Sequence, residues 1–342
     1  MQKIRILVKI IIFFVIYIGV QSLLKFVLLD DTNTISRVMI HDMYSQEKNI
    51  DVLFCGASHC QLGINPYIMD EALGKNTFNA GSSSQGLETS LALIKEVAAN
   101  NDLEQVFVDL DYSIVMRDTP NLESIYIISD YMRPSVRKFS YLLNATPFDY
   151  YLNSFMPLHK GCGYAKTFGE IGELLRRKSD AGYWNYTNVD PSYGGKGYIA
   201  SRTVVVADDP VFTDEYVNVS GEIPESSVKY INQIIEFCDK KNIELVFINI
   251  PITDYRASRM NCYDEFINAI DSLTASKGVK YYDFNLYRPE VLPLNDIKYY
   301  NDDNHLNVEG STVFAMTFGA FIKGDISEED IFYPSFADKY GR

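Results

Sequence analysis

Short, wholly apolar segments that alternate with amphipathic ones are the feature that most limits the fold of this 342-residue chain. Strands are expected at 52–55, within 76–86, and at 104–112, 244–252 and 279–284. Amphipathic helices are expected at 87–100, 226–242, 262–276 and 308–322. Strands that are apolar along their whole length are buried on both faces, as in parallel sheets covered by helices. The sequence therefore predicts a three-layer α/β/α sandwich with a parallel sheet.

The first thirty residues contain an apolar run, Ile4 to Leu29, that is long enough to cross a bilayer as a helix. Basic residues precede its densest part and acidic residues follow it: Lys3, Arg5 and Lys9, then Asp30 and Asp31. The positive-inside rule then places the amino end in the cytoplasm and the rest of the chain outside it. A cleaved signal peptide is the alternative, but its apolar region would be shorter and would end in small residues. We therefore expect residues 1–31 to be a cytoplasmic terminus and an uncleaved signal anchor, a single pass through the cell membrane that contacts lipid through residues 4–29.

The charge of the chain excludes some classes of partner. The formal net charge is −14, and a nucleic-acid binder needs basic surface to neutralise phosphates, so nucleic acid is not expected as a partner. Without residues 1–31 the chain keeps 27 basic and 43 acidic residues, a net charge of −16. A domain with that charge is not expected to lie flat on anionic lipid. The five cysteines show no C-x-x-C spacing, so no metal and no cofactor are expected.

The rest of the chain divides unevenly. Residues 32–49 are polar and mixed, and we expect a short stalk or a leading helix. Residues 50–342 make up the α/β domain, in which residues 113–225 interrupt the alternation and contain the only tryptophan. An insertion on a rigid scaffold often selects the substrate. A cap or a surface for a partner protein explains it equally well, and the sequence leaves the two open.

A serine follows the first predicted strand. Ser58 comes directly after the strand and its turn at 56–57, and ligands of parallel sheets bind beyond the carboxyl ends of the strands. Its own backbone N–H can point the same way as its hydroxyl. Gly81 follows the next strand and could bring a second N–H close, because it has no side chain. Two converging amides would make an oxyanion hole of the kind that acyl transfer requires.

Asp302 and His305 crowd the turn before the last predicted helix. A separation of three residues in a tight turn lets the carboxylate accept a hydrogen bond from Nδ1 of the imidazole. Nε2 is then able to take the proton of a serine. The pattern therefore predicts a Ser58–His305–Asp302 triad. Asp303 is expected to be solvated, and Asn307 is expected to cap the last helix.

Four motifs together resemble the SGNH/GDSL hydrolase superfamily: FCGASHCQLGINP, NAGSSSQG, VDLDY and YNDDNHLNVEG. The resemblance covers about residues 50–112 and 225–325. With the apolar run, it is similar to the membrane-anchored extracytoplasmic branch that includes the teichoic-acid D-alanylation protein DltD and the alginate O-acetylation proteins. It implies a three-layer, flavodoxin-like α/β/α fold with Ser58 as nucleophile, His305 as base and Asp302 as its orienting acid. Gly81 would match the oxyanion glycine of that family.

The chain also departs from the family pattern. Its first motif reads Gly-Ala-Ser-His instead of Gly-Asp-Ser-Leu, and its third motif lacks the asparagine that many members use in the oxyanion hole. The oxyanion hole would then rest on the two backbone amides, and Asn79 or His59 could help them. Asp109 and Asp111 end a strand at the predicted cleft and could form the turn or bind a cationic group. The basic residues 176–178 are most simply a solvated helix end, with a phosphate-binding patch as the alternative.

Two functions follow as expectations. The first is a membrane-anchored, extracytoplasmic serine esterase or acyltransferase that acts on O-acetyl or D-alanyl groups of a cell-envelope polysaccharide or teichoic acid. The resemblance implies a membrane-bound O-acyltransferase as its partner. The second is a non-catalytic assembly or glycan-binding subunit of such a system that retains the fold.

Overall fold

The computed structural model of the chain describes residues 2–151, 154, 165, 167–206, 209 and 215–341. Its centre is a five-stranded sheet in the order β2-β1-β3-β7-β9. All four pairings in this sheet are parallel. The strands are β1 (Val52–Cys55), β2 (Thr77–Asn79), β3 (Gln105–Asp109), β7 (Glu244–Asn249) and β9 (Lys280–Asp283). This is the flavodoxin-like doubly wound order, in which the chain changes direction between β1 and β3.

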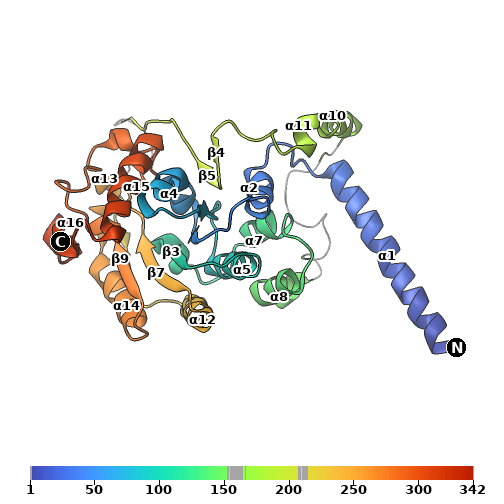
Figure 1. Ribbon diagram of the computed structural model, residues 1–342, viewed down its shortest axis with the longest axis horizontal. Helices are drawn as coiled ribbons and strands as arrows, with labels where there is room; N and C mark the ends of the chain where they lie inside the picture. Colours follow the sequence, from blue (N-terminus) through green and yellow to red (C-terminus); the bar gives the residue numbers. More distant parts are fainter. Residues whose placement is uncertain are drawn as a thin grey trace.

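Helices cover both faces of the sheet (Figure 1). Leu53 and Val106 point into one apolar core with the helices on that side, which are α5 (Leu87–Val97), α12 (Glu225–Lys241) and α14 (Tyr263–Ala275). Phe54 and Phe107 point into the other core, which is closed by α3 (Ser58–Gly63), α4 (Pro66–Leu73) and α15 (Val308–Lys323). Alternate residues of a strand face opposite sides of the sheet, so each strand contributes side chains to both cores. The predicted three-layer α/β/α sandwich with a parallel sheet is confirmed.

Short elements complete the second half of the domain. A two-stranded parallel pair is formed by β6 (Val217–Asn218) and β8 (Met260–Asn261). The remaining elements lie between β7 and the carboxyl end of the chain: α13 (Asp254–Ala257), η3 (Phe284–Leu286), η4 (Ile297–Tyr299), α16 (Glu328–Ile331) and α17 (Phe336–Tyr340). The predicted helices at 226–242, 262–276 and 308–322 therefore agree with α12, α14 and α15 to within a residue at each end.

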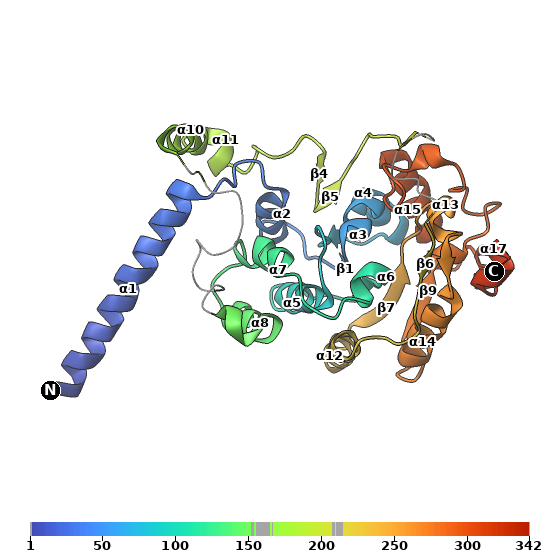
Figure 2. The ribbon, with the colours of Figure 1, turned by 180° about the vertical axis from the view of Figure 1, so that it is seen from behind.

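The insertion is mainly helical over its described residues. It contains α6 (Tyr112–Val115), α7 (Leu122–Ser129), α8 (Val136–Ala145), η1 (Phe148–Tyr150), α10 (Phe168–Lys178), α11 (Ala181–Trp184) and the hairpin of β4 (Tyr193–Gly195) and β5 (Tyr198–Ile199). His159 lies outside the described residues. Figure 2 shows that α7 and α8 lie towards α1, whereas β4 and β5 lie above the sheet.

Residues 32–49 do not form a stalk. They contain α2 (Ile35–Tyr44), whose Met39, Ile40 and Met43 are buried in the same core as Leu53. The polar composition of the segment concealed this, because the apolar residues occupy only one face of the helix. The segment is thus the leading helix of the two alternatives, and it belongs to the domain.

The apolar run forms α1 (Gln2–Leu28), a helix that projects from the domain (Figure 1). Its mean hydropathy is 2.4 over the most apolar stretch, and none of that stretch is buried by the rest of the chain. A helix of this length and composition is suited to a bilayer, as a membrane anchor or as a signal sequence.

Candidate active site

Ser58 is the first residue of α3, immediately after the turn that leaves β1. Gly56 makes this turn possible, because a Cβ there would lie 2.6 Å from Cβ of Asp109 and 2.8 Å from Cβ of Cys60. The end of β3 can therefore approach the turn closely only if residue 56 has no side chain. The serine consequently stands at the carboxyl edge of the sheet, between β1 and β3, where ligands of doubly wound folds bind.

The structure brings together the three residues predicted as a triad, although Ser58 is 247 residues from His305 in the chain. Ser58 Oγ lies 2.7 Å from Nε2 of His305. His305 Nδ1 lies 2.9 Å from Oδ1 and 2.8 Å from Oδ2 of Asp302. Each of the three side chains is half-buried, so the hydroxyl remains accessible. Burial alone would raise the pKa of Asp302, but hydrogen bonds from His305 and from the backbone lower it to about 2.

The loop that carries Asp302 and His305 is held from several sides. Asp302 Oδ1 accepts the backbone N–H groups of Asn304 and His305, each at 2.8 Å. The backbone N–H of Asn301 donates to the carbonyl of His305 at 2.7 Å, which closes the turn. The buried Tyr300 hydroxyl donates to the carbonyl of Ile252 beyond β7. The imidazole is thus fixed before any substrate arrives.

Gly81 lies where it was predicted, beside the serine turn, because a Cβ there would meet Gln61 N at 2.8 Å and Ala57 O at 3.1 Å. The expected oxyanion arrangement is nevertheless not formed. The backbone N–H of Gly81 donates to Oδ1 of Asn79 at 2.9 Å. Asn79 Nδ2 in turn donates to the carbonyls of Cys60 and Ile64. Asn79 is fully buried and is a structural residue, so the expectation that it supplies an oxyanion donor is wrong for this structure.

His59 forms a second histidine–aspartate pair next to the first. Its Nδ1 lies 3.0 Å from Oδ2 of Asp111, and its ring stands edge-on to His305 at 4.8 Å between centroids. Burial lowers the pKa of His59, but the charges of Asp111, Asp109 and Asp302 outweigh it and raise the pKa to about 9. His59 is therefore an imidazolium at neutral pH, adjacent to the serine. Of the two alternatives for Asp111, the structure favours the binding of a cationic group. That group is the side chain of His59 in the same chain.

Asp109 is almost completely buried beneath this pair. Its Oδ1 accepts the backbone N–H of Ile250 at 3.2 Å, which ties β3 to the end of β7. Burial raises the pKa of Asp109 to about 7, against the attraction of His59. This carboxyl therefore joins two strands of the sheet, so the alternative that Asp109 forms the turn is wrong.

The other predictions at the site have mixed outcomes. Asn307 caps α15 as expected, with its Oδ1 accepting the N–H groups of Glu309 and Gly310. Asp303 is not solvated as expected: its side chain is largely covered, its carboxylate lies 4.0 Å from Arg256, and burial raises its pKa.

Sequence reasoning missed the part of the insertion that braces the site. Ser201 Oγ donates to Oδ1 of Asn301, and the backbone N–H of Val205 donates to the carbonyl of Tyr300. These residues follow the β4–β5 hairpin, so the insertion holds the loop that carries the imidazole. Nothing in the polar run at 200–203 signals this contact, since the partner lies about one hundred residues away.

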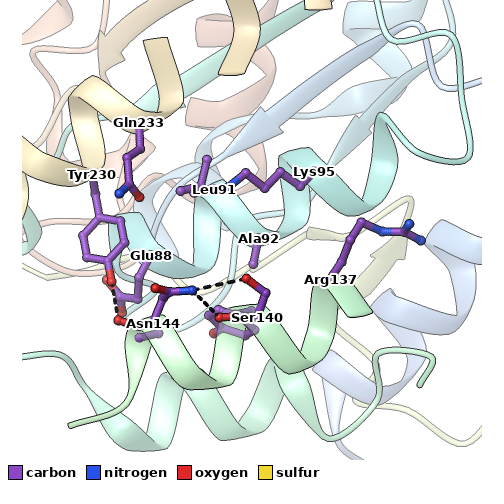
Figure 3. Close-up of a pocket in the computed structure, with 11 residues that line it drawn as sticks. Glu88, Leu91, Ala92, Lys95, Arg137, Ser140, Asn144, Tyr230 and Gln233 are labelled. Carbon is purple, nitrogen blue, oxygen red and sulfur yellow. Dashed lines mark hydrogen bonds between the residues drawn. The ribbon is translucent and has the colours of Figure 1, made fainter. Parts of the chain in front are cut away.

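Among the described residues, no group of three or more metal-ligating side chains is present. A cavity of about 160 Å³ lies between α5, α8 and α12, and Figure 3 shows Glu88, Tyr230 and Asn144 around it. The three predicted triad residues do not line this cavity. The arrangement at the sheet edge consists of a hydroxyl, an imidazole oriented by a carboxylate, and a neighbouring imidazolium.

Comparison with known proteins gives only distant likenesses. No family model matches the chain, and no similar curated protein was found. A proposed acylhydrolase from Bacteroides fragilis superposes with a TM-score of 0.39 at 10% identity, covering 86% of this chain and 98% of that one. A GDSL-like lipase from Bacteroides thetaiotaomicron gives a TM-score of 0.39 at 9% identity, covering 86% and 100%. At such low values neither the fold nor the activity of this chain rests on these matches.

Proposed function

We propose that the protein is a serine esterase or acyltransferase of the SGNH/GDSL type. The observation that carries this proposal is the unbroken chain of contacts from Ser58 Oγ through His305 to Asp302. A serine hydroxyl is a weak nucleophile until a base removes its proton, and the base must be held in the correct tautomer. The strand order and the site at its switch point support the same assignment.

The reaction follows from these positions. Ser58 Oγ attacks the acyl carbonyl carbon as its proton passes to His305 Nε2. Asp302, whose pKa is about 2, stays ionised and stabilises the imidazolium. When the tetrahedral intermediate collapses, the proton passes from His305 to the leaving oxygen, and an acyl-Ser58 ester remains. Water or a sugar hydroxyl then gives up its proton to His305 and takes the acyl group.

The oxyanion needs donors that differ from those expected. The first turn of α3 leaves its backbone N–H groups without acceptors within the helix, so the amide of Ser58 is one donor. The Gly81 amide could join only by leaving Asn79 Oδ1. The His59 imidazolium supplies positive charge close to the serine, where the family asparagine is missing. We assign it the role of compensating for that asparagine.

The substrate class follows from α1 and from the family resemblance. An anchor with its basic residues first would place the domain on the outer face of the cell membrane. There the acyl donors would be O-acetyl or D-alanyl esters of an envelope polysaccharide or teichoic acid, and the acceptors would be water or hydroxyl groups of such a polymer. A membrane-bound O-acyltransferase would be the partner that exports the acyl group.

A non-catalytic assembly or glycan-binding subunit is the second candidate. The engagement of the Gly81 amide by Asn79 favours it, because an oxyanion hole is then incomplete. The two candidates differ in the effect of Ser58→Ala in cells. Polymer acylation would be lost if Ser58 forms the acyl-enzyme, and it would be retained if the fold serves only assembly.

Labelling of the full-length protein with a fluorophosphonate probe tests the proposal directly. We expect covalent labelling of the wild type and of Ser83→Ala, which removes an exposed serine close by in sequence. Labelling should be absent in Ser58→Ala and strongly slowed in His305→Ala. A folded wild type that takes no label would contradict the proposal.

A further inference from the structure

The carboxyl end of α1 is fastened to the insertion on the side of α7. Lys25, in the last turn of α1, lies 3.5 Å from the carboxylate of Asp130 and 5.2 Å from the centre of the Tyr131 ring. The charge of Lys25 is therefore paired within the protein at the carboxyl end of α1.

A buried lysine fastens the same end on the side of α10. The side chain of Lys178 is only 1% exposed, and its Nζ lies 3.0 Å from Oδ1 of Asp31. It also donates to the carbonyls of Phe26 and Leu29, at 2.9 and 2.6 Å. These are carbonyls that a helix end leaves without partners. Lys178 is therefore not part of a solvated helix end, as the sequence suggested, but a cap on α1.

Two further pairs surround this lysine. Arg177 Nη2 lies 2.8 Å from the carboxylate of Asp30. Tyr183, from α11, donates its hydroxyl to Asp31 at 3.2 Å and packs its ring against Arg37 of α2. Asp30 and Asp31, which follow the apolar run, are thus both paired with side chains of the protein. These contacts, together with that of Tyr183 with Arg37, join α1, α2, α10 and α11 into one unit.

Apolar side chains remain exposed around this unit. Trp184 is 59% exposed although its ring stacks on Phe26 at 5.9 Å between centroids. Phe168, at the start of α10, is 94% exposed. Figure 1 shows α10 and α11 at the end of α1 where the chain enters the domain. A tryptophan that stacks on the last turns of a bilayer-spanning helix lies at the depth where lipid headgroups meet acyl chains, the region that Trp favours.

We propose that α10 and α11 form a membrane seat, in which Trp184 and Phe168 insert into the interfacial layer of the bilayer that α1 crosses. The occupant is lipid rather than a protein, because Trp184 is continuous with the fully exposed surface of α1. The contact is apolar, since the nearby cations Lys178 and Arg177 are already paired with acids. It therefore needs no anionic lipid, in keeping with the negative charge of the domain.

The seat also requires that α1 remains attached. Removal of residues 1–28 would take the Phe26 carbonyl from Lys178 and the stacking partner from Trp184. A buried ammonium that loses one of its three acceptors is less well satisfied, so these contacts favour an anchor over a cleaved leader. This inference rests on α1 as an anchor and not on the esterase activity.

The chain offers its own probe, because Trp184 is its only tryptophan. Full-length protein would be reconstituted in phosphatidylcholine vesicles whose acyl chains carry bromine at shallow or deep positions. We expect shallow bromines to reduce the fluorescence of Trp184 by roughly half, and deep bromines to reduce it less. Ser58→Ala should behave identically, which separates this test from the proposed chemistry.

A matched control moves the probe to the far side of the domain. Met316 of α15 is also largely exposed, and Figure 1 shows α15 remote from α1. Trp184→Phe combined with Met316→Trp should show no quenching by either lipid, whereas Trp184→Phe combined with Phe168→Trp should be quenched. Unquenched Trp184 in vesicles that contain the protein would overturn the seat. Equal quenching at 184 and 316 would also overturn it, because the whole domain would then lie against lipid.

Discussion

The sheet edge and the anchor junction both gather charged groups from distant parts of the chain, but they treat those groups differently. At the sheet edge, Ser58, His305 and Asp302 are half-buried, and the hydroxyl proton has an acceptor waiting for it. At the junction, Lys178 is almost wholly buried, and three oxygens surround its ammonium, including one from Asp31. The hydroxyl of Ser58 can give its proton to His305 during a reaction. The ammonium of Lys178 is fully hydrogen-bonded within the protein, so its role is to hold α1 to the domain. Variants should therefore separate the two regions by activity and by stability.

The largest effect is expected from Asp302→Asn. An amide there can no longer hold the tautomer of His305 that leaves Nε2 unprotonated, so kcat should fall by about 10³- to 10⁴-fold. KM for a soluble ester should change little, since Asp302 is not placed to bind the acyl group. Steady-state kinetics on an aryl acetate would measure both. A variant with near-normal kcat would remove Asp302 from the reaction.

The junction should respond in stability rather than in rate. Lys178→Met leaves Asp31 buried without its cation, which should lower the unfolding free energy by about 3 to 5 kcal/mol. Arg176→Met is the matched control, because Arg176 lies in the same helix turn but pairs only with the exposed Glu173. Denaturant unfolding of the full chain in nanodiscs would compare them.

The control should leave the unfolding midpoint unchanged, and kcat should be preserved in both folded proteins. Equal stabilities for the two variants would show that the buried ammonium does not hold the junction. A loss of kcat in Lys178→Met at a temperature where it is folded would remove the distinction between the two regions.

The His59–Asp111 pair gives a pH dependence. The folded pKa of His59 is raised to about 9, above its ordinary value of 6.5, so its contribution to stability is complete below pH 6.5 and is lost as pH rises towards 9. Over that window the loss should be on the order of 2 to 3 kcal/mol. Asp109, with a pKa near 7, makes its own change mostly below this window.

His59→Gln should have a lower stability at pH 6.5 but a flatter curve from pH 6.5 to 9. Urea unfolding at half-unit pH steps would give both curves. Parallel curves for the wild type and the variant would mean that His59 is not charged in the folded protein, and the proposed electrostatic role would fall with it.

Gly81→Ala should have the smallest effect. The new Cβ would lie 2.8 Å from the backbone nitrogen of Gln61, so α3 must shift, at about 1 to 3 kcal/mol. Gly172→Ala is the control: it lies in α10 with no atom within 4 Å of the new Cβ, and should stabilise the chain by about 0.5 to 1 kcal/mol. Thermal unfolding would show opposite signs, and a neutral Gly81→Ala would show that the turn has room.

Much of the fold and the triad could be predicted because the signals are local. The apolar run at Val52–Cys55 indicates a buried strand, and the alternation of such runs with helices determines which ends meet at one edge of a parallel sheet. Ser58 follows the first strand and His305 precedes the last predicted helix, so their meeting follows from topology. Asp302 follows from its spacing to His305.

The parts that could not be predicted depend on contacts across the fold. The Gly81 amide is taken by one side-chain orientation of Asn79, which no sequence pattern specifies. Residues 176–178 look alike as a basic helix end, yet only Lys178 points inward, because α1 passes beside it about 150 residues earlier in the chain. The sequence left a stalk and a leading helix open for segment 32–49, because a one-sided apolar face is diluted by its polar neighbours.

The short connection between α1 and α2 has a consequence for the proposed function. Residues 29–34 are all that separate the two helices, and Asp30 and Asp31 within this segment are held by Arg177 and Tyr183. A long flexible tether would let a catalytic domain sweep through a wide volume. If α1 is the proposed anchor, Ser58 would keep one distance and one orientation relative to the lipid surface, and the proposed polymer substrate would have to move to bring each ester to it. The spacing of modified units along such a polymer would then be set by the polymer's own stiffness.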